Sequence, residues 1–336
     1  MFVALLESDQ SRVEAANAIR KLRHICPHCF ELVILHSKKV KRPHFKHRKD
    51  AECPYRQSES WQHEHAKAAI LAGARAKGLI AEPECEVLSI DGDRRADVII
   101  LAPSTDLTKN EMQRRRAFEV QYSAISYCDL MKRTHAYMAA SLPLLWVAVI
   151  DDGKFKTLHR VNGTNLVCVS GYSVPSWVED IAHLHRRLWI YVPQSNGFWR
   201  AWLLPHWCYK NPTDSFHDSY GEYHSSSSGN WYQAAKKRDL YLDGPYSFGS
   251  LKVATGKHSD NPLIAPNREK RWLVELLPDG FETELDPPIE QKRCPHLHNG
   301  KDTGFYTYVE WHKFNGSDAK ATFSLLGQFP KLERYV

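Results

Sequence analysis

The sequence lacks any apolar run long enough to cross a membrane as a helix. Its longest strongly apolar stretch, Leu142–Ile150, contains a proline and is nine residues long, whereas a membrane-spanning helix needs about 20. The first residues, Met1–Glu7, have no basic residue ahead of their acidic one, so we do not expect a secretory signal peptide. We therefore expect a cytoplasmic protein with no membrane partner.

A strong charge imbalance is also missing. The 336 residues carry a net charge of +6, which permits a polyanionic partner without requiring one. A hydrophobic content of 43% is ordinary for a globular protein, and the length suffices for two domains. Basic residues are nevertheless concentrated in one short stretch, which is either a solvated hairpin or a patch that contacts phosphate. They are Lys38, Lys39, Lys41, Arg42, Lys46, Arg48 and Lys49.

The eight cysteines favour metal binding over disulfides, because a cytoplasmic compartment is reducing. A Cys-x-x-Cys motif precedes a predicted strand and the basic hairpin, and a histidine and a third cysteine follow. This order predicts a four-coordinate structural zinc site. Its ligands are Cys26, Cys29, His47 and Cys53. His44 lies an odd number of residues from His47, so an extended chain would point it to the opposite side.

Two alternatives to zinc stay open for these cysteines. They are a set of reduced thiols in a small core, or a redox Cys-x-x-Cys, although the βαβ pattern that accompanies such a motif is missing. Around them, residues 2–6 are typical of a short strand. Ser11 predicts the cap of a helix with Val13, Ala16, Ile19 and Leu22 at helical spacing.

Residues 58–150 are expected to form one α/β core, a mixed sheet flanked by helices. Periodicity and turn residues predict helix, three strands, helix and strand in that order. Asp91-Gly92 is expected as the turn between the first two strands. The helices are expected at 58–77 and 126–140, and the strands at 85–90, 95–101, 116–122 and 144–150.

Two of these strands place an acid among apolar residues, namely Asp97 and Glu119. A buried carboxylate is costly unless a positive charge compensates it, and a bound cation is the usual compensation. Gln121 points to the same side as Glu119, because strand residues alternate. We therefore expect Asp97 and Glu119 to hold a divalent ion at a nuclease centre. Hard oxygen ligands suit Mg²⁺ or Mn²⁺ there, rather than zinc.

The predicted order of elements resembles the αβββαβ core of the PD-(D/E)xK nucleases, a restriction-endonuclease-like α/β fold. The resemblance implies that Asp97 and Glu119 coordinate Mg²⁺, which lowers the pKa of the attacking water. It also implies that Gln121 stands where most such enzymes have lysine. A glutamine is no general base near neutral pH, so it would orient the water by hydrogen bonding.

The sequence is more closely similar to the competence protein CoiA family, over about residues 2–152. The matching motifs are Cys26-Pro27-x-Cys29, His44-Phe45-x-His47 with Cys53, Glu59-Ser60 with His63 and Lys67, Glu86, Arg95-Ala96-Asp97-Val98, Glu119-x-Gln121-x-Ser123, and Arg133-Thr134-x-x-Tyr137. This resemblance implies that Glu59 and Glu86 join the acidic centre. It assigns contact with phosphate to His63, Lys67, Arg95, Ser123, Arg133 and Tyr137, and we add Lys41 and Arg42 of the basic hairpin. By residue types alone, Glu59, His63 and Lys67 would be solvated pairs on a helix surface, each contributing about 0.2–0.5 kcal/mol.

We expect three parts: a zinc-knuckle-like subdomain at 1–56, a nuclease core at 57–152, and a region of unknown type at 153–336. The last part is rich in tryptophan and arginine, which are either core residues or a surface that stacks on unpaired bases. The favoured function is a metal-dependent DNA nuclease acting in transformation or in defence against foreign DNA, with recombination or defence proteins as partners. The residues do not distinguish DNA from RNA. The alternatives are a non-catalytic nucleic-acid-binding adaptor and a zinc-stabilised protein-interaction module.

Overall fold

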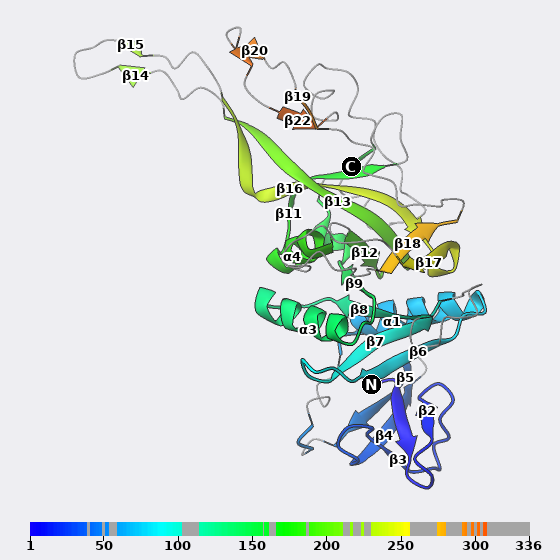
Figure 1. The fold of residues 1–336 in the computed structure, drawn as a ribbon. Helices are drawn as coiled ribbons and strands as arrows, with labels where there is room; N and C mark the ends of the chain where they lie inside the picture. Colours follow the sequence, from blue (N-terminus) through cyan, green and yellow to red (C-terminus); the bar gives the residue numbers. More distant parts are fainter. Residues whose placement is uncertain are drawn as a thin grey trace. The chain divides into compact units, whose positions relative to one another are not determined.

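The chain divides into two compact units in a computed structural model (Figure 1). One unit comprises Met1–Val149 with Ser247–Leu276, and the other comprises Ile150–Tyr246 with Leu277–Val336. The predicted division at residues 56 and 152 stays a prediction. The structure describes residues 1–38, 41–48, 51–53, 59–102, 114–156, 158–160, 166–185, 188–210, 216–217, 223–224, 230–255, 274–279, 291–293, 297–298, 301–302 and 305–307.

The first unit begins with a small antiparallel sheet in the strand order β2-β1-β3-β4-β5. Its inner side buries Ala4, Val33 and Phe45 with two cysteines, and a basic hairpin joins β4 to β5 as predicted. The strand predicted at residues 2–6 is also present. The bounds are β1 Val3–Leu6, β2 Arg12–Glu14, β3 His24–Ile25, β4 Leu32–Lys38 and β5 Lys41–His47.

The helix predicted after Ser11 is wrong. Residues Arg12–Glu14 instead form β2, in which Val13 pairs with Ala4 of β1. Ser11 does not cap a helix, because its amide and hydroxyl both donate to the Asp9 carboxylate. Ile19 and Leu22 are exposed, so the apolar face of the expected helix has no core to pack against. Pairing with β1 therefore outweighed local periodicity.

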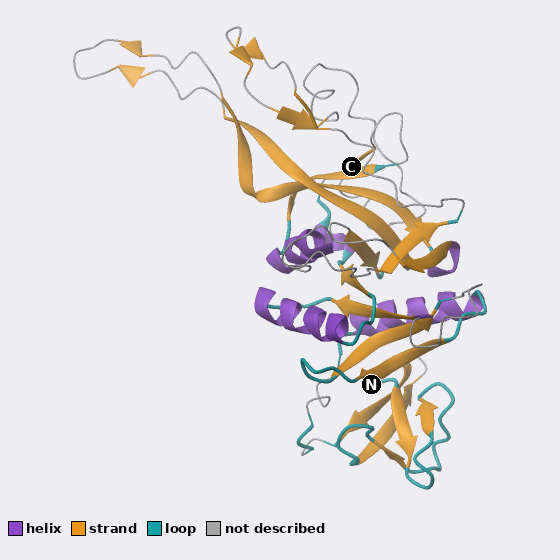
Figure 2. Cartoon of the chain, viewed as in Figure 1, coloured by secondary structure: helices purple, strands orange, loops and turns teal. Residues whose placement is uncertain are grey.

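The second layer of this unit contributes four neighbouring strands of a mixed sheet, in the order β9-β8-β7-β6. Strands β8 and β9 are parallel and the other neighbours antiparallel, since the helix α3 carries the chain across between β8 and β9. Figure 2 shows two helices lying along these strands. The fold is therefore the expected mixed α/β arrangement. The bounds are α1 Trp61–Ala76, β6 Ala81–Val87, β7 Arg94–Leu101, β8 Arg115–Gln121, α3 Tyr127–Ala139 and β9 Leu144–Val149.

Serine side chains start both helices. Ser60 accepts a hydrogen bond from the amide of His63, and Ser126 accepts one from the amide of Asp129. Such caps satisfy amides that have no partner within the helix. Gly78 follows α1 with a φ of +72°, the left-handed conformation that commonly ends a helix. The predicted boundaries of both helices are confirmed to within a few residues.

A later segment completes the first unit. The short 3₁₀ helix η3, Phe248–Ser250, packs on α1, and the rings of Phe118 and Phe248 lie 5.6 Å apart. A Cβ atom added to Gly73 would lie 2.6 Å from Cβ of Phe248, so only glycine fits at this contact. Strand β17, Leu251–Thr255, follows and pairs with β18, Val274–Pro278.

The second unit is built on antiparallel strands in the order β10-β11-β16-β13-β12. Its core holds Trp189, Tyr191 and Trp199, all essentially without solvent exposure. No helix among the described residues of the chain is long and apolar enough to span a membrane. The bounds are η2 Asp152–Lys154, β10 Leu158–Arg160, β11 Val167–Ser173, α4 Ser176–His185, β12 Leu188–Val192, β13 Gly197–Lys210, β14 Phe216–His217, β15 Tyr223–His224, β16 Asn230–Tyr246, β19 Gln291–Arg293, β20 Leu297–His298, β21 Lys301–Asp302 and β22 Phe305–Thr307.

Candidate functional site

A cluster of three cysteines and one histidine lies against the N-terminal sheet. The ligand atoms of Cys26, Cys29, His47 and Cys53 all lie within 4.8 Å of one another. Sγ of Cys26 is 4.0 Å from Sγ of Cys53, and Sγ of Cys29 is 3.4 Å from Nε2 of His47. A tetrahedral zinc ion with bonds of about 2.0–2.3 Å sets its ligand atoms about 3.5–3.8 Å apart. The donor set therefore fits a zinc ion.

The local chain preorganises this cluster. The amide of His28 donates to Sγ of Cys26, and the amide of Phe30 donates to the Cys26 carbonyl, with Phe30 in a left-handed conformation. Burial lowers the pKa of His47, which favours the neutral imidazole that binds metals. His44 is turned away and stacks on His36 at 5.7 Å. The strand alternation that separated His44 from His47 is thus confirmed.

A second cluster is set by the register of three strands. Val98 pairs with Pro83 on one side and with Phe118 on the other. The next position along β7, Asp97, therefore lies between Glu84 of β6 and Glu119 of β8, in one row across the sheet. All three carboxylates are buried. Two of these acids, Asp97 and Glu119, are the pair that the sequence predicted.

Asp97 is held by two hydrogen-bond donors. The amide of Val120 donates to its Oδ2 at 2.8 Å, and Nε2 of His63 lies 3.0 Å from the same oxygen. Burial opposes ionisation, but the charges of His63 and Lys67 hold the pKa of Asp97 well below its ordinary value. Burial likewise opposes the imidazolium, yet Asp97 raises the pKa of His63. These two groups therefore favour a charged pair.

Lys67 lies at the centre of the acids and is fully buried. Its Nζ donates to both carboxylate oxygens of Glu59 at 2.9 and 3.0 Å, and to Glu84 at 3.1 Å. Oδ1 of Asp97 is 3.4 Å away. Glu59 lies just before Ser60, the cap of α1, and Lys67 of the second helical turn donates back to it. Lys67 thus serves as an internal counterion, and the contact with phosphate expected for it stays a prediction.

Glu119 has a different environment. Tyr137 donates a hydrogen bond to its carboxylate, and Nη1 of Arg133 lies 3.9 Å from the other oxygen. Burial and the charge of Asp97 raise the pKa of Glu119 to about 8. The raised pKa favours the protonated form of Glu119 near neutral pH. The carboxylates of Asp97 and Glu119 are the oxygen ligands that could hold a divalent cation such as Mg²⁺ or Mn²⁺, which would displace that proton.

Glu86 does not lie in this cluster, contrary to the prediction. It is exposed and pairs with Arg95, and the acid that β6 contributes to the row is Glu84. A two-residue turn at Asp91-Gly92 would have set Glu86 opposite Asp97. The strands instead end at Val87 and begin again at Arg94, so the register shifts by two residues. No motif or pattern around Glu84 marks it as a site residue, and its φ of +54° is rare for a glutamate.

The remaining predicted residues differ in how they relate to this cluster. Arg95 approaches Glu59 at 4.0 Å and Glu84 at 3.8 Å. Gln121 is buried, and its Nε2 donates to the Ser123 carbonyl at 2.6 Å. Arg42 is exposed on β5, while the side chain of Lys41 lies outside the described residues. Contact of these residues with a substrate stays a prediction.

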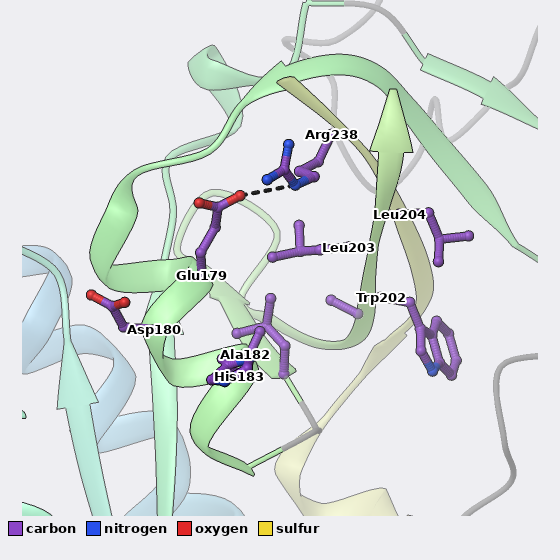
Figure 3. Close-up of a pocket in the computed structure, with 10 residues that line it drawn as sticks. Glu179, Asp180, Ala182, His183, Trp202, Leu203, Leu204 and Arg238 are labelled. Atoms are coloured by element: carbon purple, nitrogen blue, oxygen red, sulfur yellow. Dashed lines mark ion pairs between the residues drawn. The ribbon is translucent and has the colours of Figure 1, made fainter. Parts of the chain in front are cut away.

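The second unit contains an open groove of about 490 Å³ between α4 and β13. Figure 3 shows Glu179 and Arg238 joined at one end of it, with Nε of Arg238 2.9 Å from the carboxylate. Trp202 lies on the opposite side of β13 from Leu203 and packs with Tyr241 and neighbouring apolar residues. Trp177, Trp189 and Trp199 are buried, so these tryptophans are core residues and present no stacking surface.

Comparisons with known families agree with this arrangement. Residues 59–217 match the family model described as competence protein CoiA, nuclease-like domain. Residues 8–56 match the model described as competence protein CoiA, N-terminal domain. Together the two matches cover more than half of the 336 residues and reach beyond residue 152, where the predicted resemblance ended. No curated protein and no solved structure matches the chain.

Proposed function

This chain belongs to the competence protein CoiA family, and on that premise we propose that it is a divalent-metal-dependent nuclease that hydrolyses phosphodiester bonds of DNA. The observation that carries the proposal is the pairing of Asp97 with Glu119. They are buried neighbours on adjacent strands, and Glu119 has a pKa raised to about 8 by burial and by Asp97. Mg²⁺ or Mn²⁺ bound between these carboxylates would lower the pKa of the attacking water and offset charge on the phosphate.

The other residues of the cluster have supporting roles in this proposal. His63 and the amide of Val120 fix the orientation of Asp97, and Tyr137 does the same for Glu119. Gln121 uses its amide nitrogen on Ser123, which leaves its oxygen to accept a hydrogen bond from water. Arg133 is half exposed beside Glu119, where its guanidinium can contact a phosphate.

The N-terminal cluster has a structural role in the same proposal. Zinc bound by Cys26, Cys29, His47 and Cys53 would tie β5 to the loop before β4. The amides of Phe2 and Val3, in and beside β1, donate to Glu84 at 2.8 and 3.3 Å. The zinc-binding sheet is thereby joined to the acid row. We propose foreign DNA as the substrate, taken up in transformation with recombination proteins as partners, or destroyed in defence.

A second function is favoured by one observation. Each acid of the row already bonds a cationic or donor group of the protein: Asp97 has His63 and Lys67, and Glu84 has Lys67. A cation would compete with these contacts. The chain would then be an adaptor that binds nucleic acid without hydrolysing it.

A cleavage assay separates the two. The full chain is incubated with linear, circular and single-stranded DNA in Mg²⁺ and in Mn²⁺, alongside Asp97→Asn and Glu119→Gln. Asp91→Asn, at an exposed turn, is the matched control. We expect the control to cleave normally and the two centre variants to lose about 100-fold or more of the rate, with DNA binding in EDTA unchanged. Absence of cleavage in every metal, with salt-sensitive binding retained, would support the adaptor instead.

A further inference from the structure

Helix α1 carries an aromatic pair on the side away from the acid row. Trp61, its first residue, is 51% exposed, and its ring meets that of His65 edge-on at 5.6 Å. Trp61 and His63 are two residues apart, about 200° around the helix. His63 therefore contacts Asp97 while Trp61 faces outward. An exposed tryptophan leaves a large apolar face available to a partner.

An apolar groove continues along the same side of α1. Ala68 and Ala72 follow Trp61 and His65 at spacings of three and four residues, so all four share one face. The groove has a volume of about 360 Å³. Its walls are mostly small or apolar side chains from α1, the N-terminal sheet and β6. They include Phe2, Pro43, Ala68, Leu71, Ala72 and Pro83.

The two arginines at this groove differ in their contacts within the described part of the chain. Arg75 is bonded to Glu14 and to the Ala81 carbonyl. Arg42 is exposed, and within the described part of the chain no carboxylate lies at ion-pair distance from it. Arg42 lines the groove together with Ala68, which lies about one helical turn after His65 on α1, and partial burial and the charge of Arg42 lower the pKa of His65. Lys46, also on β5, is exposed as well.

We propose that this face of α1 binds an unpaired strand of DNA. A base stacks on Trp61, the adjoining phosphate contacts Arg42, and a neighbouring base enters the groove. Uncompensated positive charge beside an aromatic ring and an apolar groove is the combination that single strands recognise. A duplex offers phosphates but keeps its base faces stacked. The inference rests on the proposed nuclease function, for which it names the unpaired strand as the form of substrate.

Binding measured without metal tests this inference independently of cleavage. Fluorescence anisotropy in EDTA compares the full chain on a single-stranded oligodeoxynucleotide and on its duplex. Trp61→Ala should weaken single-strand binding about tenfold, since stacking of one base contributes on that order, and Trp61→Phe should weaken it less. Arg42→Ala should lower the salt slope on the single strand by about 0.7. Duplex binding should change less than about twofold for Trp61→Ala.

Two control variants remove an apolar side chain and a cation from exposed positions outside the proposed binding face. Ile90→Ala deletes an apolar side chain that is 94% exposed, and Lys21→Ala deletes an exposed cation of the N-terminal sheet region. Both should bind like the wild type. The inference would be overturned if Trp61→Ala lost affinity equally for the single strand and the duplex. It would also be overturned if the controls lost as much affinity as the variants, or if the wild type did not bind the single strand. A chain that binds single strands through Trp61 but never cleaves would instead overturn the proposed nuclease and leave this inference standing.

Discussion

Lys67 of α1 and Glu84 of β6 form an ion pair at 3.1 Å in which neither side chain is exposed to solvent. The same lysine bonds Glu59, and the same glutamate accepts the amide of Phe2. The free-energy cost of burying two charges is offset only when each charged group has its ionic and hydrogen-bonding partners. The contact therefore couples the helix, the central sheet and the first strand of the N-terminal sheet.

Removing the lysine alone should be costly. Lys67→Met leaves Glu59, Glu84 and Asp97 without their shared counterion, and loss of one partner of a buried pair costs about 3–5 kcal/mol. Urea denaturation measures the free energy of unfolding. Lys132→Met, at an exposed position on α3, should change it by less than about 0.5 kcal/mol. Equal stabilities of the two variants would contradict the role given to Lys67.

The pH dependence of stability should reflect Glu84. Burial opposes its ionisation, but the charge of Lys67 prevails and lowers the pKa of Glu84 from 4.5 to about 2. Because the pKa of Glu84 is lower in the folded than in the unfolded state, its ionised form stabilises the fold at pH values above the unfolded pKa of about 4.5. This contribution of about 3 kcal/mol disappears as the pH falls from 4.5 towards 2. The stability difference between wild type and Glu84→Gln should therefore shrink over that window. Glu86→Gln, at an exposed site on the same strand, should show no such change, and a constant difference for Glu84→Gln would refute the prediction.

Two histidines on β5 should differ in metal binding. Elemental analysis of the reduced wild type should find about one zinc per chain. His47→Ala removes a member of the cluster and should lower the zinc content strongly. His44 stacks on His36 outside the cluster, so His44→Ala should leave the zinc content unchanged. A wild type free of zinc, or the reverse order of the two variants, would rule out the proposed structural site.

Gly73 provides a test of the packing between α1 and η3. Gly73→Ala places a methyl group 2.6 Å from Cβ of Phe248 and 2.7 Å from the backbone nitrogen of Gly249, so it should destabilise the fold by about 1–3 kcal/mol. Gly153→Ala meets nothing within 4 Å and should change stability by less than about 1 kcal/mol. Thermal denaturation compares the two. If Gly73→Ala is as stable as Gly153→Ala, η3 does not pack on α1 as described.

Local chemistry explains what could be predicted from the sequence. Ser60 and Ser126 cap helices that periodicity had located, and the alternation of a strand separated His47 from His44. Asp97 and Glu119 were recognisable because acids inside apolar strands need compensation. Each of these inferences depends on residues that are near one another in the sequence.

The errors concern partners that are distant in the sequence. The segment after Ser11 has helical spacing, but pairing with Ala4 and its neighbours on β1 decides its structure. Glu84 replaces Glu86 because the connection between β6 and β7 is longer than a two-residue turn. A register shift of two residues leaves each side chain of β6 on the same face of the sheet but places a different residue of β7 opposite it. The outward direction of Trp61 likewise depends on what α1 packs against, which its own residues do not specify.

Binding of Mn²⁺ by isothermal calorimetry tests most directly whether Asp97 and Glu119 form a divalent-metal centre. The ion prefers oxygen ligands, so the carboxylates rather than the cysteine cluster should bind it. We predict a binding heat for the wild type and for Asp91→Asn, and its loss in Asp97→Asn and in Glu119→Gln. Equal Mn²⁺ binding by all four proteins, or none by the wild type, would contradict the account.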